Sequence, residues 1–199
     1  MIIRNYSHDD EPGWVRCRLL SFLDSSYFDD IRKNKEIYEY PSVCLVAQER
    51  GQIVGIIDVE YEENEGDVCY YCGGRGAVIW HVGVIPEYRR QNVASKLWDA
   101  ARTALTGAGI TRFEAWTQDD EAANMWYKQQ GFELREAYLN AFIRGVPGDG
   151  VIDKYLIQDN HGDIYGIRSL NFEAPIECKA ELEKVCYRLH EVRFFELKL

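Results

Sequence analysis

The sequence lacks any run of about 18 consecutive apolar residues, the length that a membrane-spanning helix needs. The first residues, Met1 to Tyr6, also lack the basic-then-apolar pattern of a signal peptide. The six cysteines are scattered, mostly among apolar residues, which is typical of reduced, buried thiols. We therefore expect a cytoplasmic protein with no membrane partner.

Basic residues are in deficit, because 23 Lys and Arg stand against 33 Asp and Glu, for a net charge of -10. A general nucleic-acid binder usually carries a basic face, so we expect no nucleic-acid partner. An acidic protein still attracts cationic ligands such as amines. The share of hydrophobic residues, 46%, is ordinary for a folded globular chain and excludes a disordered or collagen-like one.

Common ligand-binding motifs are missing as well. The chain contains neither a P-loop nor the Gly-x-Gly-x-x-Gly dinucleotide motif. Cys69 and Cys72 have Cys-x-x-Cys spacing, but Cys178 and Cys186 lie too far apart to supply the second pair of a zinc site. The acidic turn at 159–163 lacks the spacing and the terminal Glu of a calcium loop. We predict no metal site.

What the sequence does contain is an alternation of β-rich runs and helical stripes, which indicates an α/β or α+β fold. Expected strands cover residues 2–5, 43–48, 53–61, 77–85, 111–117, a strand from 132, and 192–199. Expected helices cover about 14–22, 28–38, 92–107 and 120–130. In the tail we expect a hairpin of residues 151–158 and 164–172. A helix from Pro175 should follow, with its apolar stripe at Leu182, Val185, Cys186 and Leu189.

The most informative segment runs from Val82 to Ser95: a strand, a short polar loop, then a helix that begins on small residues. In that arrangement several backbone N–H groups and the positive end of a helix point at one spot, which suits a phosphate or diphosphate. Arg89 and Arg90 add charge-assisted contacts. Small residues such as Ala94 let a ligand approach the backbone closely. The pattern predicts an anion site at this loop.

This segment resembles the acetyl-CoA diphosphate loop of the GCN5-related N-acetyltransferase (GNAT) superfamily, which reads [Gln/Arg]-x-x-Gly-x-[Gly/Ala] after a strand ending in Val-x-Pro. Arg89, Ala94 and the Val84-Ile85-Pro86 sequence match, whereas Asn92 replaces the central glycine. Asn tolerates a left-handed backbone better than most other residues do. The resemblance implies that acetyl-CoA is held by Val82, Gly83, Val84, Arg89, Arg90, Gln91, Asn92, Val93, Ala94 and Ser95.

A second segment, from Asn124 to Phe132, resembles a later motif of the same superfamily. Asn124 and Tyr127 lie three residues apart and share a helix face. The resemblance implies that both residues contact the cofactor and that the Tyr127 hydroxyl protonates the leaving thiolate. It also implies that backbone groups of Val82 to Val84 bind the pantetheine and polarise the thioester carbonyl. The implied reaction is direct acetyl transfer to an amine in one ternary complex.

The acceptor amine must lose a proton before it attacks, because at a lysine-like pKa of about 10.4 only roughly one in a thousand is neutral at pH 7. His81 is one candidate base. Strict alternation puts its side chain opposite those of Val82 and Val84, unless a β-bulge changes the facing. Glu60 is the other candidate. Small amines, polyamines, aminoglycoside-like compounds and peptide N-termini remain open as acceptors, and the acidic composition favours a small cationic amine.

The resemblance implies a mixed, mostly antiparallel sheet flanked by helices, with residues 1–143 as the N-acetyltransferase core. Residues 144–199 would complete the same domain with the extra hairpin, a helix and a closing strand. That hairpin either shapes the acceptor pocket or forms a homodimer contact, since edge strands invite pairing. One alternative is a non-catalytic acyl-CoA-binding or sensor module on the same fold. Another is a structural or interaction protein that has lost the cofactor site.

Overall fold

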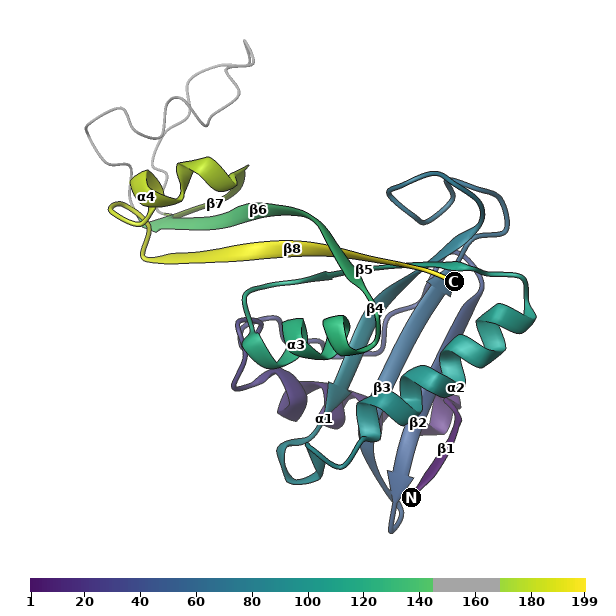
Figure 1. Cartoon of the computed structure of the whole chain (residues 1–199). Helices are drawn as coiled ribbons and strands as arrows, with labels where there is room; N and C mark the ends of the chain where they lie inside the picture. Colours follow the sequence, from purple (N-terminus) through teal and green to yellow (C-terminus); the bar gives the residue numbers. More distant parts are fainter. Residues whose placement is uncertain (145–168) are drawn as a thin grey trace. The chain divides into compact units, whose positions relative to one another are not determined.

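The computed structural model describes residues 1–144 and 169–199 (Figure 1). Within them, the strands form one eight-stranded sheet in the order β1-β2-β3-β4-β5-β8-β6-β7. The chain divides into two compact units. The first unit contains residues 1–116, 120–133 and 195–199, and the second contains residues 117–119 and 134–194. No helix in the two described ranges is long and apolar enough to cross a membrane.

The first unit is built on strands β1 to β5. β1 (Ile2–Asn5), β2 (Ser42–Glu49), β3 (Gln52–Tyr61) and β4 (Gly76–Val84) are successive antiparallel neighbours, and β5 (Arg112–Thr117) lies parallel to β4. β3 is buried along almost its whole length because it lies in mid-sheet with both faces covered. These strands confirm the β-rich runs predicted from the sequence.

Three helices cover the two faces of this sheet. α1 (Glu11–Phe22) lies against β3 and β4, and α2 (Val93–Gly107) packs on β2 and β3 (Figure 1). Gly55 leaves room for α2, whereas Gly83 leaves room for α1. Because Gly55 pairs with Val84, the neighbour of Gly83, the two helices lie on opposite faces. The third helix is α3 (Glu121–Gln129).

The helix predicted over residues 28–38 is wrong. Residues 23–41, which we call the strap, connect α1 to β2 without a helix. A helix there would line Lys35 up with the apolar residues of one face, but Lys35 instead forms an ion pair with Asp58 on β3. Ile37 is 98% exposed, so the strap gains little from apolar burial of its own. Contacts with the sheet therefore override local helix preference.

The second unit contains β6 (Glu133–Arg144), β7 (Ser169–Pro175) and most of β8 (Arg188–Lys198). Its small core is formed by Leu139, Ala141, Ala174 and Leu182. Most of the predicted hairpin, residues 151–168, lies outside the described residues, and residues 169–172 belong to β7.

The helix predicted from Pro175 is much shorter than expected. A 3-10 turn (Ile176–Cys178) leads into α4 (Lys179–Leu182), which has only four residues. The Tyr187 N–H donates to the Phe142 carbonyl, so the chain has already turned toward β6 by that point. Val185, Cys186 and Leu189 still pack against the small core, but from the turn and from β8. The predicted apolar stripe is therefore buried without a helix.

Candidate active site

β4 and β5 separate part of the way along their length. Their ladder ends at the pair of Ile79 with Ala115, although β4 continues to Val84. Asp58 of β3 pairs with His81 while Val59 pairs with Ile79, so Trp80 is the extra residue of a β-bulge in β4. The bulge thus lies where the two strands part.

Beyond the bulge, β4 presents backbone groups on the edge that faces away from β3. The Ile85 N–H donates to the Val54 carbonyl at 3.1 Å. Since bonding alternates along an antiparallel ladder, the peptide groups of Val82 and Val84 point to the opposite edge. The Val84 carbonyl there accepts a bond from Arg89 Nε at 3.2 Å. This edge can bond an extended, amide-containing ligand arm, the role predicted for Val82 to Val84.

The loop before α2 has the shape that the sequence predicts. Asn92 adopts the left-handed conformation, with φ 60° and ψ 22°, and Arg90 has φ 59°. The first backbone bond of α2 runs from the Lys96 N–H to the Asn92 carbonyl at 3.0 Å. The N–H groups of residues 93–95 therefore have no partner within the helix, and Asn92 makes no side-chain cap. This cradle of N–H groups, at the positive end of a 15-residue helix, fits a diphosphate.

The side chains around the cradle differ in their exposure and in their contacts. Arg90 is exposed, and Gln91 bonds to the Glu87 carbonyl at 3.0 Å. Gln91 also borders, with Val93 and Lys96, a hollow of about 530 Å³. Ala94 and Ser95 are half-buried in the first turn of α2. The small side chains predicted to admit a ligand thus lie at the cradle.

Arg89 is engaged elsewhere. Its guanidinium bonds both oxygens of Asp24, at 2.7 and 2.8 Å, and the Ser21 carbonyl at 3.0 Å. The hydrogen bond from Arg89 holds the pKa of Asp24 below its usual value. Arg89 therefore joins the cradle loop to the start of the strap, and its role toward the cofactor stays a prediction.

Tyr127 and Asn124 lie on α3 as predicted. Tyr127 is 4% exposed, and its ring stacks on Phe195 with centroids 5.4 Å apart. Burial, with a smaller contribution from Tyr27, raises the pKa of the Tyr127 hydroxyl. Asn124 is buried and donates from Nδ2 to the Asp120 carbonyl at 2.7 Å.

The strap approaches the start of α3. The side chain of Asp120 accepts a hydrogen bond from the Ser26 N–H at 3.2 Å and another from the Ser26 hydroxyl. One segment thus contacts both the cradle loop, through Asp24, and the helix that carries Asn124 and Tyr127. The strap is therefore positioned to border the site.

His81 lies on the face of the sheet that α1 covers, as strict alternation predicts. Its ring meets Trp14 edge-on with centroids 5.5 Å apart. Its Nε2 lies 2.6 Å from Oε2 of Glu36, a strap residue. The bond from His81 lowers the pKa of Glu36, against the opposing effect of burial. Sequence reasoning missed Glu36, because nothing in the pattern indicated that an irregular segment would bring it to His81.

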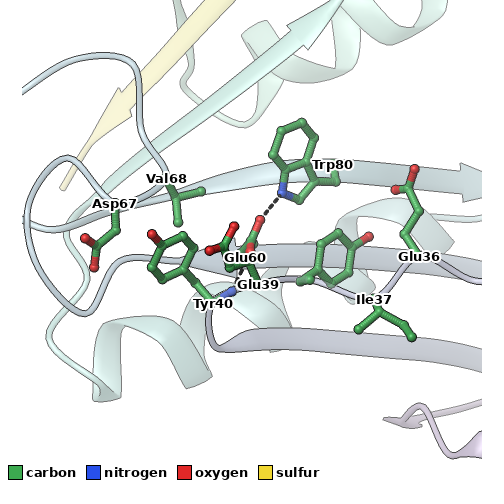
Figure 2. A pocket seen from close by; sticks show the side chains of 9 residues that line it. Glu36, Ile37, Glu39, Tyr40, Glu60, Asp67, Val68 and Trp80 are labelled. Atoms are coloured by element: carbon green, nitrogen blue, oxygen red, sulfur yellow. Dashed lines mark hydrogen bonds between the residues drawn. The ribbon is translucent and has the colours of Figure 1, made fainter.

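Glu60, the other predicted base, is buried and doubly bonded. Its Oε1 accepts the Tyr40 N–H at 2.8 Å, and its Oε2 accepts Trp80 Nε1–H at 2.7 Å. Glu60 lies at the base of a hollow of about 440 Å³ (Figure 2). The hollow combines carboxylates with aromatic and apolar side chains; its lining is Glu36, Ile37, Tyr38, Glu39, Tyr40, Glu60, Asp67, Val68 and Trp80.

Lys35 anchors the strap to β3 beside this hollow. Its ammonium lies 3.0 Å from Asp58 and within 5.5 Å of the ring centres of Tyr6, Trp14 and Tyr38. Burial lowers the pKa of Lys35, but the charge of Asp58 offsets this, and the net direction is upward. Lys35 and Glu36 therefore both join the strap to the sheet, through an ion pair with Asp58 and a hydrogen bond with His81.

Comparison with known proteins agrees with these features. Residues 41–134 match the family described as "Acetyltransferase (GNAT) domain". The chain is 28% identical over 144 residues to Acetyltransferase SG1711 of Sodalis glossinidius, covering 70% of this chain and 92% of the relative. It is 26% identical over 109 residues to N-alpha-acetyltransferase 30 of Schizosaccharomyces pombe, covering 52% of this chain and 69% of the relative.

Solved structures show the same fold. The ribosomal-protein-S18-alanine N-acetyltransferase of Escherichia coli matches with a TM-score of 0.55 and 12% identity, covering 99% of this chain and 92% of that one. The PaiA N-acetyltransferase of Thermoplasma acidophilum, solved in complex with coenzyme A, matches with a TM-score of 0.53 and 15% identity, covering 67% and 90%. The predicted fold class and the predicted resemblance to the GNAT superfamily are both confirmed, because residues 41–134 match the GNAT acetyltransferase domain and the solved structures share the fold.

Proposed function

We propose that this protein transfers the acetyl group of acetyl-CoA to the primary amine of a small cationic acceptor, by direct attack in one ternary complex. The observation that carries the proposal is that a candidate cofactor site and a candidate acceptor site both border β4 in the first unit. An N–H cradle and an open β4 edge stand ready for the cofactor, and an acidic, aromatic hollow borders the same strand.

The cofactor supplies an acetyl thioester that is activated toward attack. We assign its diphosphate to the N–H groups of Val93, Ala94 and Ser95, with Arg90 adding charge nearby. The outward N–H groups of Val82 and Val84 and the Val82 carbonyl would bond the pantetheine arm, while the Val84 carbonyl is held by Arg89. An N–H group on that edge is also suited to stabilise negative charge that develops on the thioester oxygen. These assignments are what the residues support, since each offers donors without a partner in its own element.

The acceptor would enter the hollow between the strap and β4. Four carboxylates line it, those of Glu36, Glu39, Glu60 and Asp67. Trp80 is 47% exposed and presents an indole ring beside Glu60 (Figure 2). An ammonium against such a ring gains about 0.5–2 kcal/mol, and surrounding carboxylates draw cations toward the hollow. The lining therefore favours an amine that carries at least one further positive charge.

Tyr127 would act as the general acid. A tyrosine hydroxyl is protonated at neutral pH, and burial raises its pKa further, so Tyr127 has a proton to donate to the leaving sulfur.

The test is release of free thiol from acetyl-CoA in the presence of a panel of amines, together with calorimetric titration of acetyl-CoA. We expect turnover with di- and polyamines at lower KM than with neutral monoamines. Trp80→Ala and Glu39→Gln should raise the KM for the cationic amine severalfold and leave acetyl-CoA affinity unchanged. Glu63→Gln is the matched control, because Glu63 is exposed and lies outside the lining.

Three outcomes would overturn all or part of the proposal. Acetyl-CoA binding without turnover on any amine would identify a sensor module. Absence of binding would identify a protein that has lost the cofactor site. Turnover that is insensitive to acceptor charge would keep the transferase and reject the cationic acceptor.

A further inference from the structure

Glu36 of the strap forms a hydrogen bond with His81, the one histidine of β4. We propose that Glu36 is the positioning residue of His81, and that this pair, rather than Glu60, takes the proton from the acceptor amine. The inference rests on the proposed function, because it names the base for that same reaction. It is carried by the arrangement of Glu36, His81 and the β-bulge.

The His81 ring is held firmly. The His81 residue is 7% exposed, and its Nε2 lies 2.6 Å from Glu36 Oε2. Trp14 and Phe22 of α1 pack edge-on against it, with centroids 5.5 and 6.4 Å away. Because packing and a short polar contact both fix the ring, its orientation is set before a substrate arrives, which is what a general base requires.

The contact with Glu36 also selects the tautomer. Arg32 holds the other oxygen of Glu36 at 2.6 Å, and the low pKa of Glu36 keeps it ionised. An ionised carboxylate only accepts hydrogen bonds, so His81 Nε2 must carry the hydrogen. The lone pair of the neutral ring then lies on Nδ1, which has no hydrogen-bond partner among the residues that the structure describes. Nδ1 is therefore the proton acceptor, and Glu36 stabilises the imidazolium that forms.

Glu60 lines the hollow, as Glu36 does, but Glu60 is a poorer base. Both of its oxygens already accept hydrogen bonds, from Tyr40 and from Trp80. Donors to a carboxylate favour its charged form and so weaken it as a proton acceptor. Its geometry suits recognition of a cation better than removal of a proton.

The other charges around His81 are paired with one another. Asp58, opposite His81 in the ladder, is joined to Lys35 and accepts a bond from Tyr38. Arg18 of α1 is joined to Asp30, which also contacts Arg32. The charged and titratable groups that face the pair from the strap, α1 and β3 are thus Arg18, Asp30, Arg32, Lys35, Tyr38 and Asp58. Within residues 1–144 and 169–199, Glu36 is the one carboxylate that bonds the His81 ring itself.

His81 and Tyr127 together account for every proton that moves in the reaction. The acceptor ammonium gives one proton to His81 Nδ1, directly or through one water, and the free amine forms the new N–C bond. As the C–S bond breaks, Tyr127 protonates the sulfur, and the second nitrogen-bound proton restores the Tyr127 hydroxyl. His81 passes its proton to solvent, so the reaction yields the acetamide, the free thiol and one proton.

The test compares Glu36→Gln with wild type over a range of pH, using acetyl-CoA and the amine with the highest kcat/KM. A base must be unprotonated, so the wild-type rate falls on the acidic side. Without the carboxylate the imidazolium is less stable, and we expect the acidic limb to move about 1 pH unit lower. kcat should fall on the order of tenfold while KM for acetyl-CoA stays constant, and Glu36→Asp should recover part of the loss. His81→Gln should lose roughly 100-fold or more, with acetyl-CoA binding retained.

Two controls separate positioning from structure. Asp30→Asn removes another strap contact, the ion pair with Arg18, and should lower the melting temperature without moving the acidic limb. His190→Gln removes a second histidine–carboxylate pair, formed with Asp119 at 3.0 Å in the other unit, and should leave the rate unchanged.

A readout without turnover is the nitrogen chemical shift of the His81 ring in the free protein. We expect the neutral ring to carry its hydrogen on Nε2. The hydrogen on Nδ1, or an active Glu36→Gln protein with an unmoved acidic limb, would overturn the inference. If Glu60→Gln loses most of its kcat while Glu36→Gln keeps the wild-type kcat and acidic limb, Glu60 is the general base. An inactive wild-type protein would instead overturn the proposed function, which keeps the two failures distinct.

Discussion

Tyr127 combines a packing role with a proposed chemical one. Its ring stacks on Phe195 and contacts Phe132, so the aromatic body belongs to the core of the first unit. The hydroxyl is what the proposed reaction uses. A substitution that keeps the ring and removes the oxygen separates the two roles.

Tyr127→Phe should therefore lower kcat by roughly 100-fold or more, the usual range for removal of a general acid. Acetyl-CoA affinity should change little and the fold should remain, since the aromatic contacts persist. Steady-state kinetics and calorimetric titration measure the two quantities. An unchanged kcat would remove Tyr127 from the acid role.

Substitutions at Asn92 test whether the cradle depends on one backbone conformation. It takes the place of a glycine and has φ 60°, a value that costs a β-branched residue about 1–2 kcal/mol. We expect Asn92→Val to weaken acetyl-CoA binding by about tenfold or more. Asn92→Gly, which accepts the same conformation without strain, should bind at least as well as wild type. Equal affinity in both variants would show that the cofactor does not use this cradle.

At the scale of elements, the strap and the cradle loop differ in how far sequence predicts them. The strand, loop and helix from Val82 to Ser95 were predictable because turn geometry, capping and apolar spacing are local properties. The strap was not, because its course depends on Lys35 meeting Asp58 and on Glu36 meeting His81, each on a distant strand. The carboxylate that orients the proposed base was missed for the same reason.

The anchoring of the strap can be measured. Lys35→Met leaves Asp58 as a buried charge without its cation, which should cost about 3–5 kcal/mol. Lys35→Met combined with Asp58→Asn should recover much of that loss. Chemical denaturation gives the free energies of unfolding, and hydrogen exchange across residues 23–41 reports the strap. If the double variant is as unstable as Lys35→Met alone, the ion pair is not what fastens the strap.

The first unit as a whole is also held by a buried ionic cluster at the end of the sheet away from the cradle. Arg112 on β5 contacts Glu114, Glu62 after β3, and Glu196 on β8. Burial raises the pKa of Glu114, while backbone N–H donors lower the pKa of Glu62 despite burial. Three carboxylates thus share one guanidinium in the core.

Arg112→Met should destabilise the protein by about 3–5 kcal/mol near neutral pH, because it leaves uncompensated buried carboxylates. A carboxyl group with a raised folded-state pKa holds its proton in the native state to higher pH than in the unfolded chain. Stability therefore falls as pH rises, and the loss in Arg112→Met should be smaller at about pH 5 than at about pH 8. Scanning calorimetry at both values measures this. A loss that grows on acidification would contradict the assignment.

The fold was the most predictable property of the whole molecule, because two motifs in the right order and an alternating pattern sufficed to indicate it. The proposed acceptor hollow was the least predictable, since it takes its lining from the strap, from Glu60 of β3 and the loop that follows, and from the bulge residue Trp80. These residues are distant in sequence and meet only in the folded chain.

The most direct test of the proposed acetyl transfer is to incubate the protein with acetyl-CoA and a diamine and then to measure the mass of the amine by mass spectrometry. We predict a diamine that gains the mass of one acetyl group, free coenzyme A in equal amount, and roughly 100-fold less of both products with Tyr127→Phe at matched times. Loss of acetyl-CoA without an acetylated amine, or an unmodified amine despite bound cofactor, would contradict it.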